Sequence, residues 1–291
     1  MDYTACALCA HRCLVDRTQG ELGRCRMTST MRVSRIGLHP WEEPPISGKH
    51  GSGTVFFVGC SLGCVYCQNQ RISRGEGGEE MSPEALAERM LALEEMGAAN
   101  INLVTPTHFV PSIIKTLELA KSRGLTLPIV YNTASFESVD TLRALDGLVD
   151  IYLPDFKYYH APLAKKYSFA ESYPEVARAA IAEMVRQRPA LSYREDGTLA
   201  SGVLCRLLLL PGALANTKLA LSYLYRTYGD AILISLMNQY TPVGKQKPPL
   251  HRPVTHEEYE SLLDYARRLG LTRAFTQEFG TAKESFIPEF S

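Results

Sequence analysis

Cys60-Ser-Leu-Gly-Cys64-Val-Tyr-Cys67 follows directly on Thr54-Val-Phe-Phe-Val-Gly59, an apolar stretch that is typical of a buried strand. The three cysteines have x3 and x2 spacing, which is one thiol too few to close a structural metal site. The four irons of a [4Fe–4S] cube prefer thiolate ligands, so three cysteines leave one iron free to bind another molecule. A zinc loop or three unrelated core cysteines are the alternatives, but zinc would need a fourth ligand at comparable spacing. The spacing therefore predicts a [4Fe–4S] cluster with an open position at the end of a strand.

This motif and others along the chain resemble those of the radical S-adenosylmethionine (SAM) superfamily, over almost the whole sequence. Within it, the similarity is to the branch described as pyruvate formate-lyase activating enzyme-like. The motifs are Cys6-x2-Cys9-x3-Cys13-x11-Cys25, Glu43-Pro-Pro-Ile-Ser-Gly48, Gly59-Cys60 to Cys67-Gln-Asn69, Asn102-Leu-Val-Thr-Pro-Thr-His108, Ile151-Tyr-Leu-Pro-Asp-Phe-Lys157 and Ser235-Leu-Met-Asn-Gln-Tyr240. The resemblance implies that the open iron binds SAM, and the flat ring of Tyr66 could then lie against the adenine edge. Since the branch is named by similarity, it implies the chemistry more securely than the substrate.

Composition and charge set the outer limits. The chain has 291 residues, with 45% hydrophobic and 21% charged residues, which are values of a globular protein. Lys plus Arg equals Asp plus Glu at 31 each, so no net charge would attract nucleic acid or an anionic membrane. The N-terminus lacks the features of a signal peptide and no apolar run reaches the ~18 residues of a membrane span, so we expect a cytoplasmic protein. In that reducing compartment, eight cysteines favour metal binding over disulfides.

Strand and helix patterns alternate after the cysteine loop. The predicted strands are 54–59, 101–104, 127–131, 149–153, 203–210 and 231–236. Ser82-Pro83 and the capping box Thr255 to Glu258 predict the starts of two of the helices between and after them. Six β/α units predict an α/β fold, an open partial (β/α)6 barrel of parallel strands, over residues 54–291. Residues 1–53 are predicted to form an N-terminal four-cysteine metal-binding segment, with a linker at His39–Gly53 that is rich in Pro and Gly.

Polar residues follow the predicted strands, where the active sites of such barrels lie. After the second strand the chain has Thr105-Pro-Thr107-His108, whereas the activating enzymes that it resembles carry a Gly-Gly-Glu-type turn that binds the SAM amino group. Without that carboxylate, the hydroxyl of Thr105 or Thr107 and backbone carbonyls would accept the hydrogen bonds of the SAM ammonium group. The alternative is that both threonines are turn residues with no special role. His108 is either a polar group of the pocket or a histidine with satisfied hydrogen bonds beside a helix start.

Further candidates follow the other strands. Asp155 and Lys157 stand two apart, so in an extended strand both side chains point the same way. The resemblance implies that they contact SAM, and the alternative is an ordinary ion pair. Asn132 is placed for hydrogen bonds to the SAM ribose or carboxylate. Gln239 and Tyr240 would face adenine or substrate, unless they only pack at the barrel rim.

The N-terminal cysteines have enough thiols to close a second metal site, made of Cys6, Cys9, Cys13 and Cys25. Zinc in an all-thiolate site and a second [4Fe–4S] cluster need the same ligands, and the spacing does not separate them. A cluster could pass electrons or bind substrate, whereas zinc would only hold the segment folded. His11 is a spare ligand candidate, and Cys205, within an apolar strand, is predicted to be a core residue.

Three function hypotheses follow. The first is an enzyme in which the reduced cluster cleaves SAM to a 5′-deoxyadenosyl radical that abstracts hydrogen from an unidentified substrate, with an electron donor such as flavodoxin or ferredoxin as partner. The second makes that substrate a protein glycine, as for a glycyl-radical enzyme activase, rather than a small molecule or another protein side chain. The third is a non-catalytic iron–sulfur protein that transfers electrons or senses redox state. No catalytic side chain beyond the cluster ligands stands out.

Overall fold

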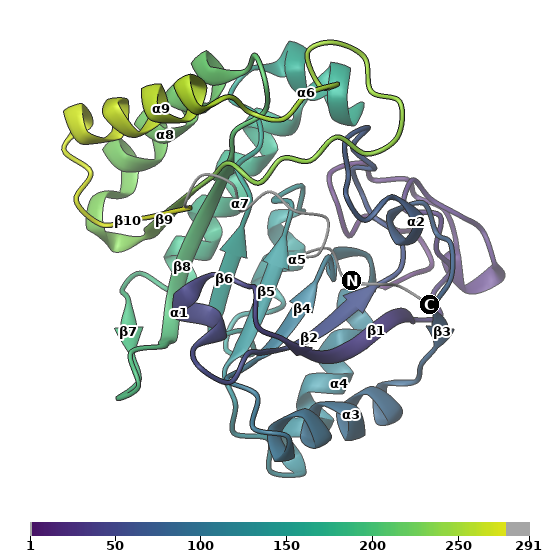
Figure 1. Cartoon of the computed structure of the whole chain (residues 1–291). Helices are drawn as coiled ribbons and strands as arrows, with labels where there is room; N and C mark the ends of the chain where they lie inside the picture. Colours follow the sequence, from purple (N-terminus) through teal and green to yellow (C-terminus); the bar gives the residue numbers. More distant parts are fainter. Residues whose placement is uncertain (1, 278–291) are drawn as a thin grey trace.

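Parallel strands form the centre of the protein (Figure 1). The computed structural model describes residues 2–277. Six neighbouring strands run parallel: β2 (Ser52–Phe57), β4 (Ile101–Val104), β5 (Ile129–Thr133), β6 (Ile151–Pro154), β8 (Leu199–Leu208) and β9 (Leu233–Met237). These are the six strands that the sequence predicts, and the partial-barrel fold is confirmed.

Shorter or antiparallel strands extend the sheet at both sides. β1 (Arg32–His39) pairs antiparallel with β2, and β3 (Glu79–Glu80) pairs with β1. At the other side β10 (Ala274–Thr276) lies parallel to β9, and β7 (Ser192–Tyr193) forms a short hairpin with β8. In the part of the chain that the structure describes, the sheet thus ends at β3 and β10 and does not close into a barrel.

Helices connect the parallel strands, mostly on one side of the sheet. The α-helices are α1 (Pro44–Ser47), α2 (Gln70–Ser73), α3 (Pro83–Glu95), α4 (Val110–Ser122), α5 (Val139–Arg143), α6 (Ala161–Ser168), α7 (Tyr173–Gln187), α8 (Leu214–Tyr228) and α9 (His256–Leu269), and 3-10 turns lie at η1 (Arg17–Gln19), η2 (Thr107–Phe109) and η3 (Gly229–Ala231). Ser82 Oγ accepts a hydrogen bond from Ala85 N, 3.2 Å away, at the start of α3. Both reciprocal bonds of the Thr255–Glu258 capping box are present at the start of α9. These helix starts agree with the sequence prediction.

The inner face of the sheet is covered by α1, on the side opposite α5 and α7 (Figure 1). Ile46 of α1 is fully buried in an apolar cluster with Val130, Ile151, Leu153, Leu199, Leu204 and Leu233. The stretch that was expected to be a linker therefore fills the interior of the partial barrel, because its apolar residues can be buried there. β1 and α1 both lie within residues 1–53, so this segment packs continuously with the barrel; the boundary near residue 53 stays a prediction.

Candidate active site

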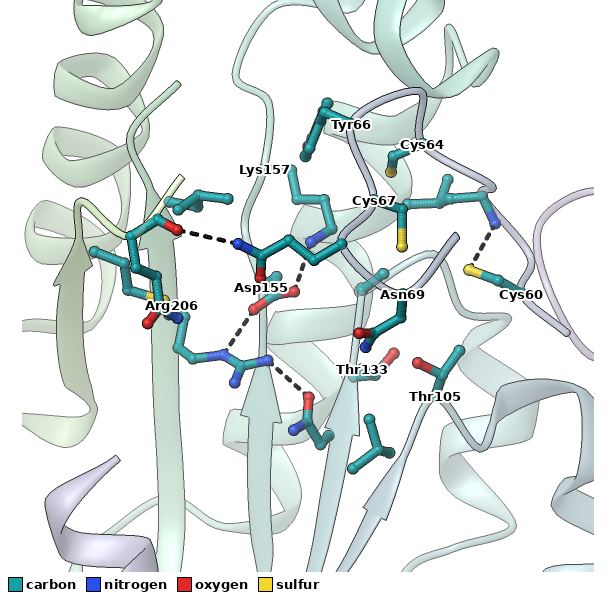
Figure 2. A pocket seen from close by; sticks show the side chains of 18 of the residues that line it. Cys60, Cys64, Tyr66, Cys67, Asn69, Thr105, Thr133, Asp155, Lys157 and Arg206 are labelled. Atoms are coloured by element: carbon teal, nitrogen blue, oxygen red, sulfur yellow. Dashed lines mark hydrogen bonds and ion pairs between the residues drawn. The ribbon is translucent and has the colours of Figure 1, made fainter. Parts of the chain in front are cut away.

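Three cysteines meet at one cavity beside the carboxyl ends of the parallel strands (Figure 2). The cavity has a volume of about 270 Å³, and Cys60, Cys64 and Cys67 all contribute to its wall. None of these thiols is in a disulfide. The amide of Leu62 donates to Cys60 Sγ at 3.4 Å, and Ser168 Oγ donates to Cys64 Sγ at 2.8 Å. Hydrogen bonds to sulfur stabilise the thiolate form that iron binds, so this donor set fits a [4Fe–4S] cluster.

Burial favours the neutral thiol form of Cys60 and Cys67 by raising their pKa values. Burial is the largest cause that raises the pKa of Cys60 to about 12, and the neighbouring Cys64 and Cys67 contribute to this rise. Within residues 2–277, no three His, Cys, Asp or Glu side chains lie close enough to hold a single metal ion. A cube of four irons, by contrast, spreads its cysteine ligands further apart than one ion does.

Arg206 of β8 is the centre of an ion-pair network on the cavity wall (Figure 2). Its guanidinium donates to Asp155 Oδ1 at 2.8 Å and to Asn132 Oδ1 at 2.7 Å. It also pairs with Glu42 Oε1 at 2.9 Å, and Lys157 Nζ lies 2.6 Å from the second oxygen of Asp155. The network therefore links residues from β5, β6, β8 and the segment before α1.

The network fixes the charges of its members. Burial alone would raise the pKa of Asp155, but the Arg206 guanidinium and the Lys157 ammonium hold it below its ordinary value. Burial alone would lower the pKa of Lys157, but Asp155 raises it. Lys157 is therefore a cation beside the cysteines at neutral pH, although its side chain is only 16% exposed.

Most of the predicted site residues line this cavity. They are Tyr66, Thr105, Asn132, Asp155, Lys157, Gln239 and Tyr240, together with the three cysteines. Tyr66 is almost buried and accepts a hydrogen bond from the Tyr158 hydroxyl at 2.8 Å. Tyr240 is also buried, and its hydroxyl donates to the Leu250 carbonyl. The cavity thus has apolar rings at the cysteine end and charged groups at the sheet.

Two predicted residues lie outside the cavity. Thr107 is buried and its hydroxyl donates to Glu137 at 2.7 Å. His108 Nε2 lies 2.7 Å from the Val58 carbonyl, so the ring nitrogen is the donor, and burial lowers the pKa of His108 to about 3. His108 is thus a neutral, buried histidine behind the cysteine loop: its Nε2 is hydrogen-bonded, whereas its Nδ1 has no hydrogen-bond partner among residues 2–277. The chain turns into η2 directly after Thr105, which directs Thr107 and His108 away from the cavity.

Thr105 itself has an unusual backbone. Its φ of 59° is left-handed, which is rare for a β-branched residue, and its amide donates to the Asn132 carbonyl at 2.9 Å. Such strained conformations concentrate at binding sites because the surrounding structure holds them there. Figure 2 shows the Thr105 side chain beside Cys60 and Asn69.

The four N-terminal cysteines are gathered beside this site. Cys6 and Cys25 are buried, whereas Cys9 and Cys13 are partly exposed. Burial is the largest cause that raises the pKa of Cys9 to about 12. The nearby Glu137, Cys25 and Cys13 contribute to this rise. Cys205 is fully buried in β8, as predicted.

A family model supports what these residues indicate. Residues 54–186 match the model described as the Radical SAM superfamily. This stretch is a radical SAM domain. The match covers most of β2, its cysteine loop, β5 with Asn132, and the strands that end directly before Thr105 and Asp155.

Known proteins of similar sequence or structure agree with a radical SAM fold. The uncharacterized protein MJ0674 of Methanocaldococcus jannaschii is 28% identical over 281 residues, covering 92% of this chain and 76% of that protein. A radical SAM methyltransferase from Sphaerobacter thermophilus superposes with a TM-score of 0.55 at 16% identity, over 78% of this chain and 66% of its own. SuiB of Streptococcus suis, solved with its precursor peptide SuiA, has a TM-score of 0.52 at 13% identity, over 80% and 51%. At these identities the two structures show the fold alone, and the chain spans about two thirds or less of their lengths.

Sequence reasoning missed the residue at the centre of the cavity's ion-pair network. Arg206 lies in the apolar stretch Val203–Leu210, and a single cation there was a usable signal. Glu42, its carboxylate partner, directly precedes the quoted motif that begins at Glu43. Glu137, which accepts hydrogen bonds from Thr107, Thr133 and Tyr131, carried no signal in the sequence. Among the helices of residues 2–277, none has the length and apolar character of a membrane span; the cytoplasmic location stays a prediction.

A second cavity of about 420 Å³ adjoins the first and shares Trp41, Glu42, Met237 and Gln239 with it. Its wall includes Glu43, which is 8% exposed. Burial raises the pKa of Glu43 from 4.5 to about 7; Arg206 opposes the rise, and Glu42 adds to it. The folded state therefore prefers protonated Glu43, so its contribution to stability is complete below pH 4.5 and is lost as the pH rises through 7.

The variant Glu43→Gln should remove this pH dependence. A difference of 2.5 between the two pKa values corresponds to about 3 kcal/mol, so the free energy of unfolding of the variant should gain up to about that much relative to the original chain between pH 4.5 and pH 8. Urea unfolding at several pH values measures this. Glu95→Gln, at an exposed position of α3, is the control. Parallel pH curves for Glu43→Gln and the original chain would contradict the assignment.

Proposed function

We propose that this chain is a radical SAM enzyme that cleaves SAM reductively and uses the resulting radical to abstract hydrogen from its substrate. One observation carries the proposal: three free cysteines and the Asp155–Lys157 pair line the same cavity. Bound there, a reduced [4Fe–4S] cluster would supply one electron to the SAM sulfonium and release the 5′-deoxyadenosyl radical and methionine. Positioning and the exclusion of water are the work of the protein.

The side chains offer a partner for each part of SAM. Lys157 presents an ammonium group for the methionine carboxylate, and Thr105 offers a hydroxyl and a strained backbone for the SAM amino group. Arg206 donates a hydrogen bond to Asn132 and so fixes the position of this side chain, which would bind a ribose hydroxyl of SAM. Tyr66, Leu208 and Met237 give the apolar surface that an adenine ring needs. The Arg206 network would keep these groups in place before SAM arrives, which reduces the cost of ordering them.

The proposal that the substrate is a protein glycine rests on the sequence motifs. The resemblance to the activating-enzyme branch supports a protein glycine as substrate, and the Thr105-Pro-Thr107 turn, which lacks the carboxylate of those enzymes, weakens it. A small molecule or another protein side chain is the competing substrate class. A glycyl radical signal on a candidate partner after incubation with SAM would favour the first class. We further propose a low-potential one-electron donor such as flavodoxin or ferredoxin.

The experiment that tests the general proposal is a titration of the reduced, anaerobically reconstituted protein with SAM. We expect a SAM-induced change in the spin signal of the cluster and the formation of 5′-deoxyadenosine. A cluster whose signal is insensitive to SAM, with no 5′-deoxyadenosine, would support the electron-transfer or redox-sensor alternative instead.

Lys157→Met should weaken SAM binding without preventing folding. A hydrogen bond to a charged group contributes about 1.5–3 kcal/mol, so we expect the Kd for SAM to rise by roughly 10- to 150-fold. Asp155 keeps its bond to Arg206 in this variant, which limits the loss of stability. Lys165→Met is the matched control, since its side chain is 67% exposed and pairs only at the surface with Glu171. Unchanged SAM affinity in Lys157→Met would remove this residue from the proposed SAM site.

A further inference from the structure

The N-terminal cysteine segment packs directly against the loop that holds the other three cysteines. His11 Nε2 lies 2.8 Å from the Ser61 carbonyl, and Arg24 Nη2 donates to the Leu62 carbonyl at 3.4 Å. Gly59, with a φ of +91°, leaves no room for a side chain, because a Cβ there would lie 2.8 Å from the Cys25 carbonyl. The two cysteine groups are therefore in contact through backbone and side chains.

Tight turns fold the segment that carries the four N-terminal cysteines. The amide of Cys6 donates to the Val15 carbonyl at 3.0 Å, and the amide of Leu14 returns a bond to the Cys6 carbonyl at 2.9 Å. A Cβ on Gly23 would lie 3.2 Å from Cys13 Sγ, which places the chain before Cys25 against Cys13. The segment has no long helix or strand of its own before β1, so bound metal would supply much of its folding free energy.

A buried cation faces these thiols. Arg17 is fully buried, and its guanidinium donates to Cys6 Sγ at 3.7 Å and to the carbonyls of Met27, Thr28 and His108. Of these four acceptors, only Cys6 can carry a negative charge. Arg17 thus places a buried N–H donor and a positive charge beside Cys6, where they would compensate the negative charge of a cluster bound by these cysteines. The amide of Arg24 also donates to Cys13 Sγ, at 3.3 Å. Such donors stabilise the added negative charge of a reduced iron–sulfur cluster.

The N-terminal cysteine site lies between solvent and the cavity that is proposed to bind SAM. This position matches a redox role better than a structural one. Cys9 and Cys13 are partly exposed, whereas Cys25 is buried beside Gly59 at the start of the inner cysteine loop. Exposed arginines surround the outer side, at Arg12, Arg24 and Arg26, and would attract an acidic electron-donor protein. A structural zinc site would require neither contact with the loop nor this surface.

We infer that Cys6, Cys9, Cys13 and Cys25 hold a second [4Fe–4S] cluster that passes electrons from an external donor to the cluster at Cys60, Cys64 and Cys67. For each SAM cleaved, a reduced flavoprotein donor loses one electron, which passes through the N-terminal site to the inner site and then to SAM. Both sites return to their oxidised state, so the donor is the net reductant. The inference depends on the proposed function only for the final electron acceptor.

Metal analysis of the anaerobically reconstituted full chain tests the cluster. We expect about eight irons per chain and no stoichiometric zinc, and about four irons in each of Cys9→Ala and Cys64→Ala. On reduction, two spin signals should appear, of which only one changes when SAM is added. About four irons with one zinc per chain would overturn the inference, and this readout on the original chain stands even if Cys9→Ala does not fold.

The relay is tested by comparing two reductants. With reduced flavodoxin, Cys9→Ala should form 5′-deoxyadenosine at least tenfold more slowly than the original chain, whereas with dithionite the two rates should agree within about twofold. Equal rates with both reductants would refute the relay. Cys205→Ala, which removes a thiol outside both groups, should behave like the original chain. If the original chain forms no 5′-deoxyadenosine with either reductant, the proposed function fails, while the iron count still decides the nature of the N-terminal site.

Discussion

Replacing Cys64 by alanine should abolish SAM cleavage. Cys64 lines the cavity between Cys60 and Cys67, and a cube left with two protein ligands is not expected to persist. Formation of 5′-deoxyadenosine with dithionite as reductant should fall below detection, and the SAM-sensitive spin signal should disappear. Iron bound at the N-terminal cysteines should remain, because their ligands are separate.

The matched control is Cys205→Ala. Cys205 is fully buried in β8, so its loss should cost a modest amount of stability through packing and leave the iron content and SAM cleavage unchanged. Retention of 5′-deoxyadenosine formation by Cys64→Ala would show that the three cysteines do not act as the ligands of one cluster. Loss of activity in both variants would point to unfolding as the cause instead.

Arg206→Met should cause the largest loss of stability among single substitutions in the cavity. The guanidinium is paired with both Asp155 and Glu42, and the exposed fractions of these side chains are 12% for Arg206 and Glu42 and 21% for Asp155. Removing one member of a buried ion pair leaves its partners charged and unpaired, at a cost of about 3–5 kcal/mol. Urea unfolding under anaerobic conditions measures the loss.

Two further variants test the cause of this loss. Arg186→Met removes an arginine that also pairs with two carboxylates but is 57% exposed, so it should cost at most about 1 kcal/mol. Glu42→Gln should be less destabilising in the Arg206→Met background than alone, because it removes a charge that has lost its partner. Additive effects of the two substitutions would mean that this pair is not coupled and that Arg206 acts through Asp155, Asn132 and packing instead.

Local patterns were enough to predict the six parallel strands and their order. Each β/α unit repeats apolar residues with a period set by its own backbone geometry, and Ser82 and Thr255 cap the helices that follow them. The sequence did not predict that residues 44–47 pack inside the partial barrel. The residues next to Ile46 carry no pattern that indicates an open barrel interior for α1 to fill.

The sequence by itself indicated the three cysteines that line the cavity, the parallel sheet and the strand ends at which the cavity forms, because these depend on spacing along the chain and on strand periodicity. Only the tertiary structure decided which polar groups meet. Arg206 and Glu42 are 164 residues apart, and Thr107 turns to Glu137 although Thr105, two residues earlier, lines the cavity. It also decided that the N-terminal cysteines lie against the inner cysteine loop through His11 and Ser61. Such contacts arise from the packing of distant segments, which minimises unpaired buried charge and leaves no periodic trace in the sequence.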